Sequence, residues 1–270
     1  MPAVSTCHAP APAAALQHNV HDRRGQWIAW GSCAVILFAG LVGLWLDKVL
    51  AFGWQPVLGL CAWTIFAGLL WLSEPHERYQ ALIVVVVATF FEIVGSILWG
   101  AYVYRHHNLP SFVPPGHGMV YLFGLRLTHT RLVRAYAGPF VALATAGVLG
   151  WGLLGLGVLP RLDVAGAIGA VILAAFMTRS PSGVVYAGVF TYVAFLELYG
   201  TALGTWFWLP EVPGIGVPNG NPPSGIAGGY VFFDMAALAL TPWVMAAARA
   251  LRRGAPGTPA RAPRAQPPPA

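Results

Sequence analysis

The sequence predicts an all-α fold, a polytopic bundle of about eight transmembrane helices. Of its 270 residues, 57% are hydrophobic and only 9% are charged, whereas a soluble domain carries about a quarter charged residues. The mean hydropathy is +0.65, and apolar runs of roughly 20 residues, enough to cross a bilayer, recur along the chain. So few charges would leave a soluble fold without a polar surface, and the chain is therefore expected to be embedded in a membrane.

Eight apolar segments are the expected spans. The fourth becomes polar in its second half and the sixth is short, so the count falls to seven or six if these segments do not cross. In chain order the segments are 27–46, 54–72, 81–104, 117–133, 136–159, 164–178, 183–208 and 228–250.

Both ends of the chain differ in composition from the spans. Residues 1–26 are polar and rich in Ala and Pro, and residues 253–270 are basic and rich in Pro and Ala, so both are expected to be disordered. With the N-terminus in the cytoplasm, the outside loops hold only Lys48, Arg105 and Arg161, and the other twelve of the 15 Lys and Arg residues face the cytoplasm. This bias predicts a multi-pass protein of the cell membrane with both termini cytoplasmic.

A sequence pattern around Glu92 recurs around Glu197. "FEIVGSILWGAYVY" and "LELYGTALGTWFW" share a Glu, a Gly three residues later, a hydroxyl residue and an aromatic-x-aromatic triplet, and each precedes a loop with a Pro-Pro pair. The order and the near-constant spacing predict an internal duplication of four spans each, 27–134 and 135–252. Because four is even, the two halves are expected to be parallel, related by an axis along the membrane normal.

Three carboxyl groups lie inside expected spans: Glu92, Glu197 and Asp234. A carboxylate at the centre of a span costs roughly 2.5–3.5 kcal/mol, and burial disfavours its ionised form. We therefore expect these side chains to face the bundle interior as neutral acids able to donate a proton, which makes them the candidate catalytic residues. The alternative is that each carboxyl hydrogen-bonds a neighbouring helix and only fixes the packing.

Aromatic and polar side chains near these carboxyls are the candidate substrate-binding residues. Helical spacing places Glu92 and Trp99 on one face, and the second repeat places two tryptophans at the corresponding mouth. Tyr104 and Trp208 are explained equally well as members of an interfacial aromatic belt. The full set is Trp99, Tyr102, Tyr104, His117, Tyr121, Trp206, Trp208, Asn221 and Tyr230.

Neither a metal, nor a cofactor, nor a nucleic-acid partner is expected. The first loop contains His106, His107 and His117, but without the spacing of a metal site and without matching ligands in the second repeat. The three cysteines form no CxxC motif. No basic stretch is interleaved with stacking aromatic residues, and the sequence defines no oligomeric state.

The stretch "EIVGSILWGAYVY" with its proline-rich loop resembles the membrane carotenoid hydratases of the bisanhydrobacterioruberin hydratase and γ-carotene 1′-hydroxylase type. The similarity spans about 35 residues, bears on Glu92, Gly95, Gly100, Tyr102 and Tyr104, and has an echo in the second repeat. The continuation "GHGMVYLFGLRL" departs from that family's Pro-Leu and Trp-rich pattern. The resemblance implies an enzyme that adds water to an isoprenoid alkene.

Three hypotheses follow for the function. The first is a membrane enzyme that hydrates or cyclises an isoprenoid or carotenoid-like lipid, with Glu92 as proton donor and Glu197 or Asp234 as its partner. The second is a transporter or channel whose carboxyls bind a cation or relay protons, and the third is a scaffold. If the protein is an enzyme, we expect a lipid-sized pocket that opens sideways into the membrane. If it is a transporter, we expect a polar route to both faces of the membrane, and if it is a scaffold, we expect neither.

Overall fold

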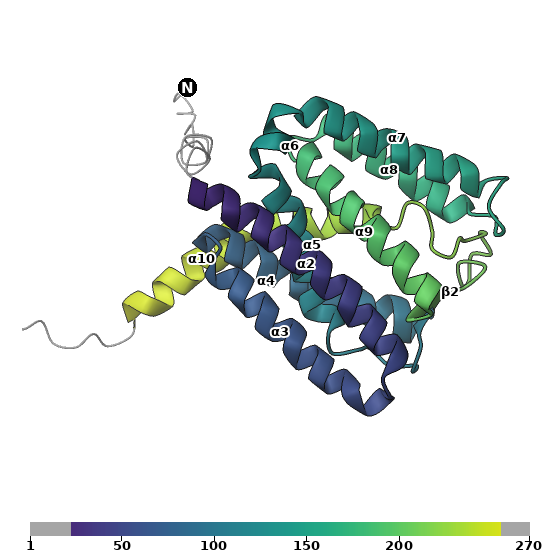
Figure 1. Ribbon diagram of the computed structural model, residues 1–270, viewed down its shortest axis with the longest axis horizontal. Helices are drawn as coiled ribbons and strands as arrows, with labels where there is room; N and C mark the ends of the chain where they lie inside the picture. Colours follow the sequence, from purple (N-terminus) through teal and green to yellow (C-terminus); the bar gives the residue numbers. More distant parts are fainter. Residues whose placement is uncertain (1–22, 255–270) are drawn as a thin grey trace, which may run out of the picture.

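The structure, a computed structural model, describes residues 23–254 as a bundle of helices (Figure 1), with side chains described as far as residue 251. Residues 1–22 and 255–270, the greater part of the two segments expected to be disordered, lie outside the described residues. The first helix begins at Arg23, so the last four residues of the expected N-terminal segment are helical.

Each of the eight expected segments contains a helix. In chain order the elements are α2 (Arg23–Val49), η1 (Phe52–Trp54), α3 (Gln55–Trp71), α4 (Pro75–Glu92), η2 (Ile93–Leu98), β1 (Tyr102–Tyr104), α5 (Val113–Thr128), α6 (Arg131–Ala135), α7 (Ala137–Gly155), α8 (Val164–Arg179), α9 (Gly183–Leu203), β2 (Trp206–Trp208) and α10 (Gly228–Gly254).

Six helical stretches among the described residues are long and apolar enough to cross a membrane. The helices in the fourth and sixth expected segments, α5 and α8, are shorter, with 16 residues each. The chain is therefore a multi-pass, predominantly helical membrane protein. One departure from the all-α prediction is a small sheet of two strands, β1 and β2.

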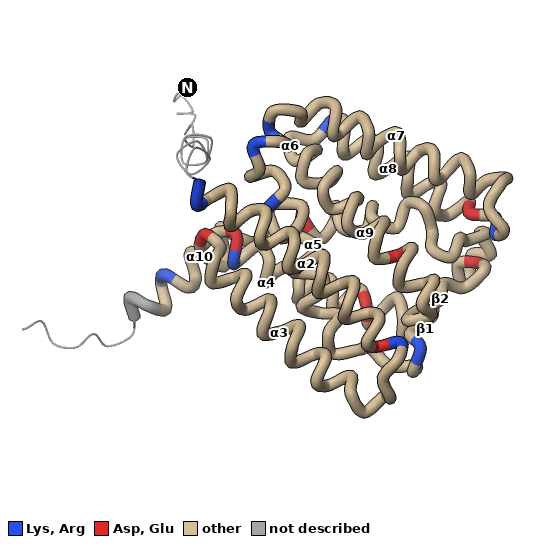
Figure 2. Tube along the Cα trace, viewed as in Figure 1, with Lys and Arg blue, Asp and Glu red and all other residues tan. Residues whose placement is uncertain are grey.

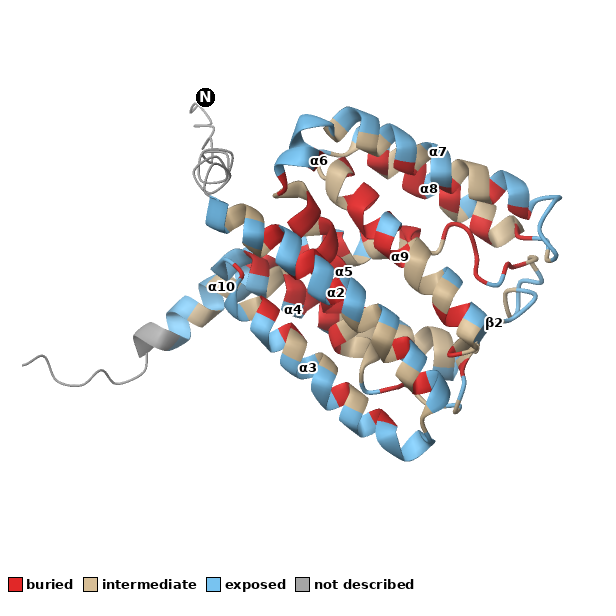
Figure 3. Ribbon diagram, in the orientation of Figure 1, coloured by how far each residue is buried: buried red, intermediate tan, exposed pale blue. Residues whose placement is uncertain are grey.

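The surface of the bundle is apolar, as contact with lipid requires. Trp27, Leu143 and Val171 are each more than half exposed. Exposure of such side chains to water is unfavourable, so this surface is suited to contact with lipid. Figure 3 shows the buried residues concentrated on α5 and on the sides of the helices that face it, with exposed residues along the outer helices. The Lys and Arg residues lie toward the two ends of the bundle (Figure 2), and the end with α6 and the start of α2 has more of them than the end with the strands.

Helix α5 is the most buried element and packs against α2, α3, α4 and α9. Its contact with α9 depends on two glycines, Gly124 and Gly188, because a Cβ added at Gly188 would lie 2.9 Å from the Cα of Gly124. Small residues of this kind let transmembrane helices approach closely where no hydrophobic effect drives them together.

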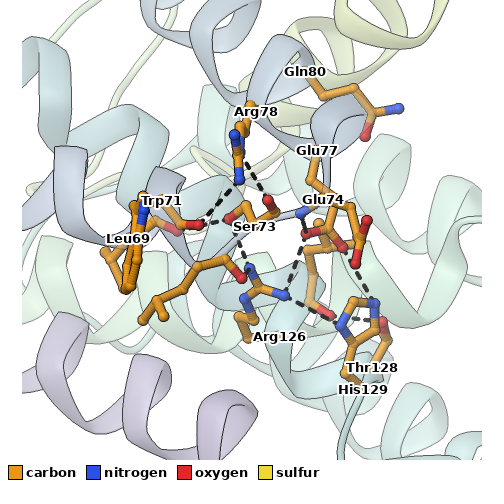
Figure 4. Close-up of polar contacts among 12 residues, drawn as sticks. Leu69, Trp71, Ser73, Glu74, Glu77, Arg78, Gln80, Arg126, Thr128 and His129 are labelled. Carbon is orange, nitrogen blue, oxygen red and sulfur yellow. Dashed lines mark hydrogen bonds and ion pairs between the residues drawn. The ribbon is translucent and has the colours of Figure 1, made fainter. Parts of the chain in front are cut away.

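A buried ion pair fixes the turn between α3 and α4 to the end of α5 (Figure 4). Glu77 is 2% exposed, and its carboxylate lies 3.3 Å from the Arg126 guanidinium and 3.7 Å from the His129 ring. Arg126 also donates a hydrogen bond of 2.7 Å to the Ser73 hydroxyl. Arg126 therefore acts as a partner inside the bundle as well as a charge at its arginine-rich end.

Replacing Glu77 by Gln is expected to destabilise the protein by about 3 kcal/mol, because it leaves the buried guanidinium without a counter-charge. Thermal unfolding in detergent measures the effect as a lower Tm. Glu74→Gln is the control, because Glu74 is exposed and its amide oxygen still accepts the capping hydrogen bond at the start of α4. Equal Tm values for the two variants would contradict this role of the pair.

Candidate functional site

The two halves of the chain meet in the strands β1 and β2. The strands pair antiparallel, with Tyr102 opposite Trp208 and Tyr104 opposite Trp206. The prediction that these triplets form the ends of membrane helices 81–104 and 183–208 is wrong. Gly100 and Gly204 both have φ of +73°, a left-handed conformation that ends a helix and turns the chain.

Glu92 is the last residue of α4, and its carboxyl accepts hydrogen bonds from the strand that follows its own helix. Oε2 accepts from the hydroxyl groups of Tyr102 at 2.6 Å and Tyr104 at 2.8 Å. Oε1 lies 2.8 Å from Nε2 of His117, which α5 supplies. Burial, reinforced by the nearby Glu92, raises the pKa of Tyr102 and of Tyr104, so both phenols remain protonated donors.

Glu197 on α9 has the same relation to strand β2, but with different donors. Its Oε2 accepts hydrogen bonds from the indole nitrogens of Trp206 at 2.9 Å and Trp208 at 3.0 Å. Its Oε1 accepts no hydrogen bond from any residue in the described part of the chain, and this oxygen is not fully covered by protein atoms. Glu197 therefore has one oxygen that is free toward the space beside it, whereas Glu92 is bonded at both oxygens.

Both carboxyls line one cavity of about 690 Å³. Aromatic rings form its roof, with the Tyr102 and Trp208 ring centroids 4.4 Å apart. Its walls are mostly apolar side chains of α5, α9 and α10 and, on the outer side, of α2 and α3. Phe38 and Cys61 lie within these helices, line the cavity, and are exposed on the outer surface of the protein. The cavity therefore reaches the lipid-facing side of the bundle.

Most of the predicted catalytic and substrate-binding residues line this cavity. Besides the two glutamates, the residues that line it from that set are Trp99, Tyr102, Tyr104, His117, Trp206, Trp208 and Tyr230. His117 is more than a wall residue, because it is paired with Glu92 and lies with its ring 5.3 Å from that of Tyr230.

Three predicted site residues lie elsewhere. Asp234 and Tyr121 line a second, much smaller cavity, because α10 places Asp234 one turn beyond Tyr230 and on the far side of Phe233. Asn221 lies in the loop after β2, where its side-chain oxygen accepts a hydrogen bond of 2.9 Å from the Trp208 backbone nitrogen. The three carboxyls therefore do not share one cavity, although two of them do.

Sequence reasoning missed the residue that anchors the second proline-rich loop. Asp163 is 1% exposed, and its carboxylate accepts hydrogen bonds from the backbone nitrogens of Gly166, Gly220 and Ser224 at 2.7–3.0 Å. Three backbone donors on one carboxylate fix a turn that would otherwise bury unpaired N–H groups. The available signal was an Asp immediately before an apolar helix, which is a preferred helix-capping position.

No family model, no curated protein and no solved structure matches this chain. Within residues 23–251, no group of three or more His, Cys, Asp and Glu side chains could hold a metal ion. The chemistry of the site is therefore inferred from its own residues.

Gly200→Ala is expected to disturb the site, because the new Cβ would lie 2.1 Å from the Trp206 indole. Trp206 must then move away from Glu197, and overpacking of this kind costs about 1–3 kcal/mol. Thermal unfolding in detergent tests this against Gly150→Ala on α7, where the added Cβ has no neighbour within 4 Å. A Gly200→Ala variant as stable as Gly150→Ala would show that Trp206 is not fixed in its observed position.

Proposed function

We propose that the protein is an integral membrane enzyme that protonates an alkene of a hydrophobic isoprenoid, leading to addition of water or to ring closure. The observation that carries this proposal is the pairing of Glu92 and Glu197 on the wall of one apolar cavity that reaches the lipid-facing surface. A cavity of about 690 Å³ is within the common range for small-molecule sites, and its apolar walls suit an isoprenoid chain drawn from the bilayer.

The hydrogen bonds favour different roles for the two carboxyls. Donors at both oxygens of Glu92 favour its carboxylate form, which suits a base. Glu197 keeps Oε1 free, and a protonated carboxyl can present its O–H to a substrate from that oxygen. We therefore assign Glu197 as the proton donor and the pair of Glu92 and His117 as the proton acceptor, the reverse of the assignment first drawn from sequence.

The proposed reaction is balanced without a cofactor. Glu197 transfers its proton to the less substituted alkene carbon and leaves a tertiary carbocation on the other carbon. The faces of Tyr102 and Trp208 stabilise that cation through their quadrupoles. Water then adds to the cation and gives up a proton to Glu92 and His117. Return of that proton to Glu197 restores the enzyme, so the net change is alkene plus water to tertiary alcohol. If an internal alkene attacks instead, a ring closes and the positive charge moves to the other carbon of that alkene. Loss of a proton from the neighbouring carbon to the Glu197 carboxylate then forms a new alkene, so ring closure is an isomerisation that restores the acid.

The architecture proposed for this enzyme is a duplicated unit of four spans, with eight crossings and both termini in the cytoplasm. Two observations support the duplication. The third helix of each half packs against the fourth helix of the other, α4 with α10 and α9 with α5, and each third helix is followed by a glycine turn and a paired strand. The excess of Lys and Arg at the end with α6 (Figure 2) supports the cytoplasmic orientation of that end.

A second candidate function is the transport of protons or cations. The observation that favours it is a set of polar side chains beyond the cavity, where the Tyr121 hydroxyl donates a hydrogen bond of 2.7 Å to Gln80 on α4 and Asp234 lies beside Tyr121. These groups extend the polar path toward the arginine-rich end. Tyr230 and Phe233 line both cavities and stand between them, so transport requires that wall to open.

Glu197→Gln is expected to lower product formation by about 10²–10⁴-fold, the usual contribution of a positioned acid. Mass spectrometry of lipids from cells with and without the protein identifies the substrate and measures the product. In D₂O, Glu197→Gln should lower the incorporation of deuterium into the lipid by the same factor. Glu92→Gln should still place deuterium on it, while giving less alcohol and more alkene isomer or ring product.

The matched control is Glu211→Gln, since Glu211 is exposed in the loop after β2 and does not line the cavity. It should form product at the parent rate. If Glu197→Gln keeps parental product formation, the enzyme hypothesis is wrong. If no lipid differs between the cells and proteoliposomes show proton flux that Glu92→Gln removes, the second candidate takes its place.

A further inference from the structure

Asp234 is a buried carboxyl that the proposed reaction does not use. It is 6% exposed, and its Oδ2 has no hydrogen-bond partner among residues 23–251. An unpaired buried carboxyl oxygen is costly, so its persistence calls for a ligand.

The missing partner has a space of its own. A cavity of about 10 Å³ lies beside Asp234 at the junction of α4, α5, α9 and α10, close to the volume that one water molecule needs. Its polar lining is Asp234, Tyr121 and Tyr186, and Val84 and Val189 supply apolar wall. Tyr186 and Asp234 line this cavity together.

The polarity of these groups matches water. The Tyr121 hydroxyl already donates its hydrogen to Gln80, so toward the cavity its oxygen can only accept. A water molecule would donate one hydrogen to Tyr121 and the other to Asp234 Oδ2, and it would sit next to the Tyr186 hydroxyl. It would then have the two to four polar partners that buried waters require.

We propose that this cavity binds a single ordered water molecule through Asp234, Tyr121 and Tyr186. The water joins α10 to α5 and α9 at the turn that carries Tyr230, the residue one turn before Asp234 whose ring lies against His117. It also completes a polar chain from Gln80 to Asp234 that ends at the wall of Tyr230 and Phe233. The site does not depend on the proposed reaction.

Radiolytic hydroxyl-radical footprinting of the full chain in nanodiscs tests the proposal, because radicals form at bound water and oxidise its neighbours. Tyr121 and Tyr186 are buried, so bulk solvent does not reach them. Both should be oxidised in the parent protein, and after rapid mixing with H₂¹⁸O both should retain more ¹⁶O than the exposed Tyr136, because enclosed water exchanges slowly.

Two variants should abolish the oxidation of Tyr121 and Tyr186, while the exposed Tyr136 is still oxidised. Asp234→Leu removes the acceptor, and Val84→Ile fills the cavity with one methylene without touching the carboxyl. Their controls are Asp234→Asn, which keeps an oxygen acceptor, and Val86→Ile, which adds the same methylene on the exposed side of α4. In both controls, Tyr121 and Tyr186 should still be oxidised. The proposal would be overturned if neither tyrosine is oxidised in the parent protein, or if their oxidation is undiminished in Val84→Ile.

Discussion

The structure around the site follows from one constraint, that a carboxyl group inside a membrane must find its hydrogen-bond donors within the protein. Glu92 and Glu197 find them in the aromatic triplets that follow their own helices. To reach the carboxyl, each triplet must fold back beside its helix, which requires the left-handed turn at Gly100 or Gly204. The two returning triplets then pair as β1 and β2, so satisfying the carboxyls also joins the halves and roofs the cavity.

The difference between tyrosine and tryptophan gives the two halves different chemistry. An indole N–H can only donate, and a phenol can both donate and accept. At Glu92 the phenols are joined by His117, for which the second half has no equivalent beside Glu197. The same backbone framework therefore presents one carboxyl saturated with donors and one with a free oxygen. Two carboxyls in unlike environments within one site are an arrangement that supports separate acid and base roles.

The sequence predicted the helices and the shared setting of Glu92 and Glu197, because long apolar runs and an ionisable residue inside them are strong local signals. It did not predict β1 and β2, because three apolar residues after a helix have no periodicity that distinguishes a strand from one more helical turn. The sequence does not separate Asp234 from the glutamates, because residues 230–240 are otherwise apolar on every side of α10, and the rotation of this stretch cannot be read from residue types. The ion pair of Glu77 and Arg126 joins positions that are distant in sequence, so no local sequence pattern predicts it.

The division between the two cavities bears on which chemistry the protein supports. On one side of Tyr230 and Phe233, the large cavity is apolar and reaches lipid, so it can desolvate an alkene next to an acid. On the other side, the polar groups around Asp234 enclose a space fit for one water molecule and no larger solute. A permeation path would need these two spaces to be continuous. The proposed reaction instead benefits from their separation, because uncontrolled water would react with the carbocation before the positioned water or the internal alkene could. In the proposed enzyme, Tyr230 and Phe233 separate the space beside Asp234 from the cavity that holds Glu92.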